Sequence, residues 1–128
     1  MIVLTGIDLA SINEVNKLAA EPGASNGIWT ASEQHAHEGY PERRAGQWAA
    51  KEAVMKVLGE GIGKIDPRDI EIESAEGRRP QVRLHGKAAI LGRNLRITSL
   101  SVSITHEYGA AAAVAVALAE EGGSGGDL

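Results

Sequence analysis

The chain has no cysteine and no phenylalanine, and aromatic residues make up only 3% of its 128 residues. Without cysteine, neither a disulfide framework nor a thiolate zinc site can form. The core must therefore be built from alanine, valine, isoleucine and leucine. A hydrophobic content of 43% with 23% charged residues is typical of a folded chain. The length predicts a single domain over residues 1–119, followed by a flexible tail over 120–128.

The sequence also lacks a positive net charge and a long hydrophobic run. Its formal net charge of -4 argues against a nucleic-acid-binding protein that depends on bulk positive charge. No segment is apolar over the length that a bilayer requires. The apolar N-terminus has no basic leader and contains Asp8, so it does not match a signal peptide. We therefore expect a cytoplasmic protein.

Hydrophobic periodicity and helix caps predict an α+β fold, in which an antiparallel sheet packs against one long buried helix. Ser11 with Glu14 and Thr30 with Glu33 match the capping box that begins a helix. Residues 22–27, with the sequence PGASNG, are expected to form a loop. The predicted helices begin at 11 and 30 and cover 41–58 and 87–94; the predicted strands cover 2–9, 69–74, 81–84, 98–105 and 110–119.

Three of these predictions specify details. The strands at 69–74 and 81–84 should form a hairpin with a turn at 76–77. In the strand at 98–105, residues 100, 102 and 104 should share one face. In the strand at 110–119, Val114 and Val116 should form the β-branched core, although so many alanines would also suit a helix. The glycines at 59, 61 and 63 match neither standard phosphate-loop spacing, so we interpret Gly59 and Gly61 as residues that end the long helix.

Three charged residues could form a site. Asp8 follows a buried strand, where a carboxylate is costly without a partner, although it could equally cap the next helix. Glu52 and Lys56 are one turn apart on a helix that is apolar on nearly every side, so they should line a cleft rather than form an ordinary surface pair. Two carboxylates can hold Mg²⁺ beside a phosphate, and a lysine can contact that phosphate.

Seven segments, in order along nearly the whole chain, resemble motifs of the holo-acyl-carrier-protein synthases, which are short 4'-phosphopantetheinyl transferases. AGQWAAKEA at residues 45–53 is similar to the family signature AGRFAAKEA. The other six matches are GID at 6–8, WTASE at 29–33, KVLGEGI at 56–62, RDIEI at 68–72, LHGKA at 84–88 and SITH at 103–106.

This resemblance implies an enzyme that transfers 4'-phosphopantetheine from coenzyme A to a serine of an acyl carrier protein and releases adenosine 3',5'-bisphosphate. It implies that Asp8 and Glu52 bind Mg²⁺ and that both act in catalysis together with Lys56. Either Glu52 or a metal-bound water would take the serine proton. The residues that would contact coenzyme A are Lys56, Gly59, Arg44, Pro80, Thr105 and His106. Such enzymes serve fatty-acid biosynthesis and secondary metabolism.

The family further implies a homotrimer with coenzyme A in clefts between subunits, which would explain a helix that is apolar on nearly every side. Gln47 stands where the family has arginine, so an anion contact would be lost and Arg43 or Arg44 would have to replace it. Residues 11–24 hold one base, Lys17, whereas the family presents several there to an acidic carrier protein. We therefore expect weak electrostatic steering and an unusual or dedicated carrier partner.

Two other functions fit the same residues. The first is a non-catalytic module that binds coenzyme A or docks a carrier protein on the same fold; it would release no adenosine bisphosphate. The second is a trimeric protein without a ligand, whose charged residues form only structural pairs; it would show no magnesium-dependent binding. The presence of Asp8, Glu52 and Lys56 together favours the transferase.

Overall fold

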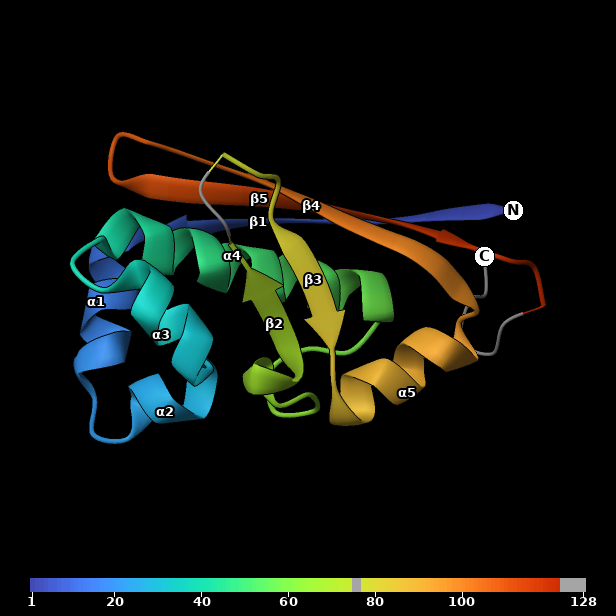
Figure 1. Cartoon of the computed structure of the whole chain (residues 1–128), viewed down its shortest axis with the longest axis horizontal. Helices are drawn as coiled ribbons and strands as arrows, with labels where there is room; N and C mark the ends of the chain where they lie inside the picture. Colours follow the sequence, from blue (N-terminus) through green and yellow to red (C-terminus); the bar gives the residue numbers. More distant parts are fainter. Residues whose placement is uncertain (75–76, 123–128) are drawn as a thin grey trace.

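The computed structural model describes residues 1–74 and 77–122 and shows a mixed helix and sheet fold (Figure 1). The predicted α+β class is confirmed. Two segments, the turn residue at 76 and the end of the predicted tail at 123–128, lie outside the described residues. The elements in order are β1 (Ile2–Ser11), α1 (Ile12–Ala20), α2 (Ala24–Ile28), α3 (Ala31–His37), α4 (Pro41–Leu58), a 3₁₀ turn (Pro67–Asp69), β2 (Ile70–Glu73), β3 (Gln81–Leu84), α5 (Gly86–Asn94), β4 (Ile97–Glu107) and β5 (Ala110–Ala119).

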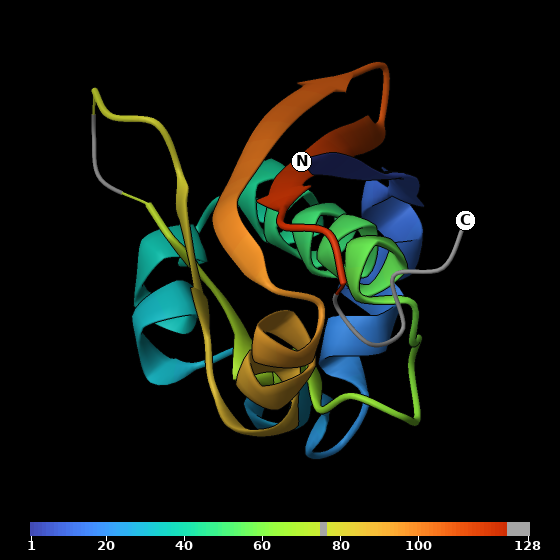
Figure 2. The same cartoon turned by 90° about the vertical axis from the view of Figure 1, so that its right-hand side faces the viewer.

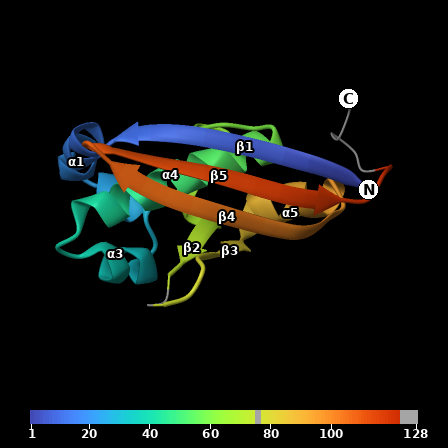
Figure 3. The ribbon, with the colours of Figure 1, turned by 90° about the horizontal axis from the view of Figure 1, so that it is seen from above.

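Strands β1, β5 and β4 form an antiparallel sheet in that order, and α4 runs across its inner face (Figures 1 and 3). Alanine occupies every second position of β5 from Ala111 to Ala119, and these five alanines are buried. Small side chains let the helix lie close to the sheet. Gly6 of β1 is part of this contact, because a Cβ there would collide with the carbonyl oxygen of Ala53.

The prediction that Val114 and Val116 form the core of β5 is wrong. Their side chains are 37% and 38% exposed, on the outer face of the sheet. Successive residues of a strand point to opposite faces of the sheet. In β5 the buried alanines face α4, so the valines between them point outward. The three-residue face predicted for β4 is correct, because Val102 is buried between the half-buried Leu100 and Ile104.

The other side of α4 is covered by α3, α5 and a second sheet, the β2–β3 hairpin (Figure 2). The predicted hairpin and helix caps are confirmed: Ser11 and Thr30 accept hydrogen bonds from the backbone N–H groups of Glu14 and Glu33. Gly59 ends α4 in the left-handed conformation, with φ 81°. The sequence analysis missed one element: residues 22–27 were expected to form a loop, but the short helix α2 begins within them, at Ala24.

Helix α4 is therefore buried by elements of its own chain, and a second subunit is not needed to explain its apolar character. The surface that stays apolar and exposed is instead the outer face of the three-stranded sheet, which no described helix or strand covers (Figure 3). None of the described helices is both long and apolar enough to cross a membrane.

Candidate active site

Asp8 lies on the inner face of β1, between the buried residues Gly6 and Ala10. The alternation of the strand turns its side chain toward α4, where only 12% of it is exposed. Among the described residues, none gives a hydrogen bond to the buried oxygen Oδ2 of Asp8. A buried carboxylate oxygen without a partner is costly and marks a place where a ligand could bind.

Glu52 and Lys56 project from α4 toward this strand, as their spacing predicted. The Lys56 ammonium donates a hydrogen bond to the carbonyl oxygen of Ile7 (2.7 Å) and lies 3.5 Å from Asp8 Oδ1. Burial and then the neighbouring Asp8 carboxyl raise the pKa of Glu52 to about 7, although Lys56 acts in the opposite direction. The structure thus brings together the three residues that the sequence proposed as catalytic.

These two carboxylates fit a magnesium ion. Two neighbouring carboxylates repel each other, and a divalent cation bound between them relieves this repulsion. No group of three or more histidine, aspartate or glutamate side chains within residues 1–74 and 77–122 is placed to hold a metal. A cation at Asp8 and Glu52 would therefore take its other ligands from backbone, water or a substrate phosphate, as Mg²⁺ commonly does.

Two clefts meet at Glu52. One, of about 480 Å³, is lined by Glu52, Lys56, Gly59 and the loop that follows α4. The other, of about 380 Å³, lies against α1 and is lined mainly by apolar side chains, among them Leu18 and Trp48. A group in each cleft could thus reach the Glu52 carboxylate from a different side. This arrangement suits a reaction that joins two substrates.

The six residues expected to contact coenzyme A do not meet within one chain. Lys56 and Gly59 line the cleft at the end of α4. Pro80 and His106 line a separate cleft of about 220 Å³ between α4 and the β2–β3 hairpin. Thr105 is exposed on β4, opposite Ala112 of β5.

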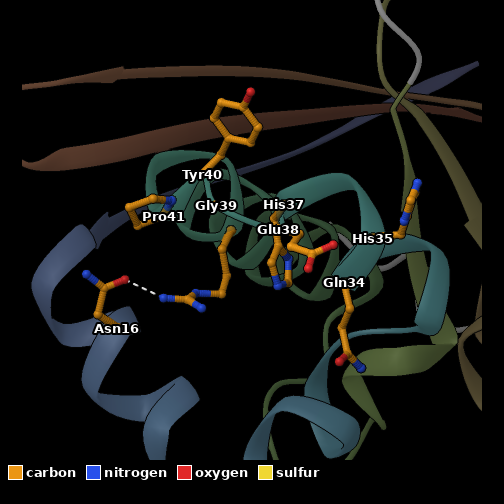
Figure 4. A pocket seen from close by; sticks show the side chains of 9 residues that line it. Asn16, Gln34, His35, His37, Glu38, Gly39, Tyr40 and Pro41 are labelled. Carbon is orange, nitrogen blue, oxygen red and sulfur yellow. Dashed lines mark hydrogen bonds between the residues drawn. The ribbon is translucent and has the colours of Figure 1, made fainter.

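Arg44 lies in a third place, in a cleft of about 680 Å³ between α1, α3 and the start of α4 (Figure 4). Its guanidinium donates a hydrogen bond to the side-chain oxygen of Asn16 (dashed line in Figure 4). This cleft is larger than the two at Glu52, yet Asp8, Glu52 and Lys56 do not line it. The positions of the charged groups, and not cleft size, therefore identify the candidate site.

Gln47 occupies a buried position and not an exposed anion site. Its amide oxygen lies 2.7 Å from Nδ1 of His37, and its amide nitrogen donates to the carbonyl oxygen of Glu33 (3.2 Å). Burial lowers the pKa of His37, so neutral imidazole is favoured at this contact. The interpretation that Gln47 only removes an anion contact misses this role, in which it joins α4 to α3.

The sequence analysis also missed a buried ion pair beside Gln47. Lys51 and Glu33 are both fully buried, with Nζ 2.8 Å from Oε1. Lys51 donates to the carbonyl oxygens of Pro67 (2.8 Å) and Ile70 (2.7 Å), and Glu33 accepts from the N–H of Ile72 (2.7 Å). The capping box at Thr30 was visible in the sequence, but the long-range partners of Glu33 were not.

Comparison with known proteins gives a consistent result. Residues 5–116 match the family model of the 4'-phosphopantetheinyl transferase superfamily. The chain is 38% identical over 118 residues to a holo-[acyl-carrier-protein] synthase of Verminephrobacter eiseniae, covering 85% of this chain and 89% of the relative. It is 47% identical over 81 residues to a synthase of Moorella thermoacetica; this match spans 61% of the chain and 63% of the relative.

A solved structure agrees with these matches. It is the holo-[acyl-carrier-protein] synthase of Helicobacter pylori in complex with coenzyme A, at 31% identity and a TM-score of 0.77, covering 90% of this chain and all of that one. The family model covers most of the chain, and the two relatives and the solved structure are all named as holo-[acyl-carrier-protein] synthases. The resemblance seen in the sequence is thereby confirmed, and the chain belongs to the 4'-phosphopantetheinyl transferase superfamily.

Proposed function

We propose that this protein transfers 4'-phosphopantetheine from coenzyme A to a serine of an acyl carrier protein, with Mg²⁺ and with release of adenosine 3',5'-bisphosphate. The observation that carries the proposal is the meeting of Asp8, Glu52 and Lys56: Lys56 lies 3.5 Å from Asp8 Oδ1, Asp8 Oδ2 is buried without a described partner, and Glu52 lines two clefts. Relatives named for this reaction, and a relative solved with coenzyme A, support it.

In this reaction the serine Oγ forms a bond to the β-phosphorus of coenzyme A. The bond from that phosphorus to the oxygen bridging to the α-phosphate breaks, and the nucleotide leaves. Lys56 contacts the pyrophosphate and stabilises the charge that grows on it. Asp8 and Glu52 would hold Mg²⁺, which supplies further neutralisation of that charge when bound.

Glu52 is placed to do more than hold a cation. It borders both clefts, so a serine entering along α1 would reach it on the side opposite Lys56. Without a cation, the pKa of Glu52 is raised to about 7, so this carboxyl group exchanges protons readily at neutral pH. We propose Glu52 as the group that takes the serine proton, with a water at the site as the alternative.

We also propose a homotrimer. The outer sheet face presents Val3, Ile7 and Leu9 of β1 beside Val114 and Leu118 of β5, and Leu9 is 72% exposed. Such a contiguous apolar face is typical of a protein interface. A neighbouring subunit would also explain why Pro80, Thr105 and His106 lie apart from Lys56: one subunit would contribute them to the coenzyme A cleft of another.

The carrier protein is proposed to be an unusual or dedicated one, because Glu14 on α1 and Glu21 directly after it are exposed against the single base Lys17. The rate constant kcat/KM for the carrier should then change little between low and high salt. A fall of tenfold or more with added salt would contradict this proposal. Single-domain organisation over 1–119 and a cytoplasmic location remain predictions.

The test of the proposed transfer is intact-mass spectrometry of an apo carrier protein incubated with this protein, coenzyme A and Mg²⁺. The carrier should gain one phosphopantetheine arm, and EDTA should abolish the gain. No gain with several carrier proteins, together with binding of coenzyme A in calorimetry, would instead identify the non-catalytic module.

A further inference from the structure

A third charged residue lies near Glu52 and Lys56, just beyond the end of α4. Glu60 follows Lys56 by four positions, and its backbone N–H still bonds to the carbonyl oxygen of Met55 (3.2 Å), so it stays attached to the end of α4. Glu52, Lys56 and Glu60 line the same cleft of about 480 Å³. The cleft that the proposed function assigns to coenzyme A, a polyanion, thus contains two carboxylates and one ammonium group.

Lys87 of α5 compensates for the second carboxylate. Its ammonium lies 3.1 Å from Oε2 of Glu60, although Lys87 is not one of the residues that line the cleft. Lys56 is instead directed to β1, where it contacts Asp8 and the carbonyl oxygen of Ile7. The charged groups therefore form two ion pairs, Lys87 with Glu60 and Lys56 with Asp8, and each pair joins two different elements of the fold.

We propose that Lys87 is a positioning residue for donor binding: it holds the Glu60 carboxylate away from Lys56 and from the phosphates of coenzyme A. The inference rests on the proposed function of this cleft. Lys56 and Glu60 line the same cleft, so without Lys87 the Glu60 carboxylate is free to turn toward the Lys56 ammonium. It would then neutralise the phosphate-binding lysine and repel the incoming anion.

A purely structural role for this ion pair predicts something different. A half-exposed pair contributes little to the free energy of unfolding. If the pair served only to tether the loop after α4, then removing either partner would have the same effect on coenzyme A binding. If Lys87 acts on the charge of Glu60, only the loss of Lys87 weakens binding, and loss of the Glu60 charge reverses that defect.

The experiment compares Lys87→Met, Glu60→Gln and the double variant with the unchanged protein, measuring Kd for coenzyme A by calorimetry and KM and kcat in the transfer assay. Lys87→Met should raise Kd and KM about three- to tenfold at low salt, with less effect at high salt and little change in kcat. Glu60→Gln should lower Kd, and the double variant should lose the defect of Lys87→Met. The matched control is Arg83→Met, which removes an ion pair to Glu73 on the hairpin, away from this cleft.

Unchanged Kd in Lys87→Met, or an equal rise in Glu60→Gln and the double variant, would overturn the role proposed for Lys87. These outcomes are distinct from failure of the proposed function. If the unchanged protein modifies no carrier but binds coenzyme A, the transfer proposal fails while the Kd comparison still decides the role of Lys87.

Discussion

Lys51 and Glu52 are neighbours in α4, yet they belong to two opposite kinds of charged cluster. Lys51 is fully buried, and its ammonium contacts three acceptors: Glu33 Oε1 and the carbonyl oxygens of Pro67 and Ile70. An ammonium group has three hydrogens to donate, so this cluster is complete. On the other side of the helix, Glu52 borders two clefts beside Asp8, which keeps a buried oxygen that no described residue satisfies.

This difference separates a structural charge from a functional one. The cluster at Lys51 uses all of its hydrogen bonds to join α4 to α3 and β2, and it has no capacity left for a ligand. The cluster at Glu52 keeps two carboxylates close together and partly open to solvent, an arrangement that a cation and a phosphate would complete. The difference between the two clusters leads to four predictions.

The largest effect is expected for Lys51→Met. Removing one partner of a buried ion pair leaves the other charge uncompensated, so the free energy of unfolding should fall by about 3–5 kcal/mol. Urea denaturation followed by circular dichroism measures it. The matched control is Lys56→Met on the same helix, whose lysine is 56% exposed and should change stability by less than about 1 kcal/mol. Equal losses in both variants would remove the distinction between the clusters.

In contrast to Lys51→Met, Asp8→Asn should lower activity and not stability. We expect the transfer rate to fall roughly 10²- to 10³-fold, because one carboxylate of the cation site is lost. Stability should be kept or increased, since the amide no longer raises the pKa of Glu52 through charge repulsion. Release of adenosine 3',5'-bisphosphate measures the rate. A variant that unfolds without losing activity per folded molecule would show that Asp8 is a structural residue.

Lys56→Met should raise the KM for coenzyme A by about tenfold or more, because a charge-assisted contact to the phosphates is lost. The KM for the carrier protein should stay within about twofold. Arg93→Met on α5, which removes an exposed cation outside the cleft, serves as the control. A rise in the carrier KM alone would assign Lys56 to the other substrate.

The smallest effect concerns pH. The pKa of Glu52 is raised from 4.5 to about 7 on folding, so its protonated form is favoured in the folded protein. This contribution to stability is fully present below about pH 4.5 and is lost as the pH rises through 7. Without metal, the Tm of the unchanged protein should therefore fall between these values relative to Glu52→Gln. Added Mg²⁺ should reverse the fall at pH 8, because it binds the deprotonated pair. Parallel curves for both proteins would contradict the raised pKa.

The sequence predicted that Asp8, Glu52 and Lys56 lie close together, because the signals for their positions are local. Glu52 and Lys56 are one helical turn apart, and the alternation of β1 determines the face of Asp8. The fold class, the hairpin and the long helix follow from the same periodicities. The helix ends were likewise marked by Pro41 and Gly59.

What could not be predicted depends on partners distant in sequence. The prediction of which face of β5 is buried was wrong. Alanine and valine alternate along this strand, and only the packing of α4 shows that the smaller residue is needed on the inner face. Glu33 was recognised as a helix cap, but its contacts with Lys51 and Ile72 join elements 18 and 39 residues away. The residues expected to contact coenzyme A lie in separate clefts of one chain, and a single sequence does not show which surfaces the proposed trimer would bring together.

The most direct test of the account is the initial rate at which an apo carrier gains phosphopantetheine mass, compared between the unchanged protein and Glu52→Gln over a range of Mg²⁺ concentrations. We predict a magnesium-dependent gain for the unchanged protein and none above background for Glu52→Gln at any concentration, with both proteins folded. Equal rates for the two proteins would contradict the assignment of Glu52, and with it the site proposed for the reaction.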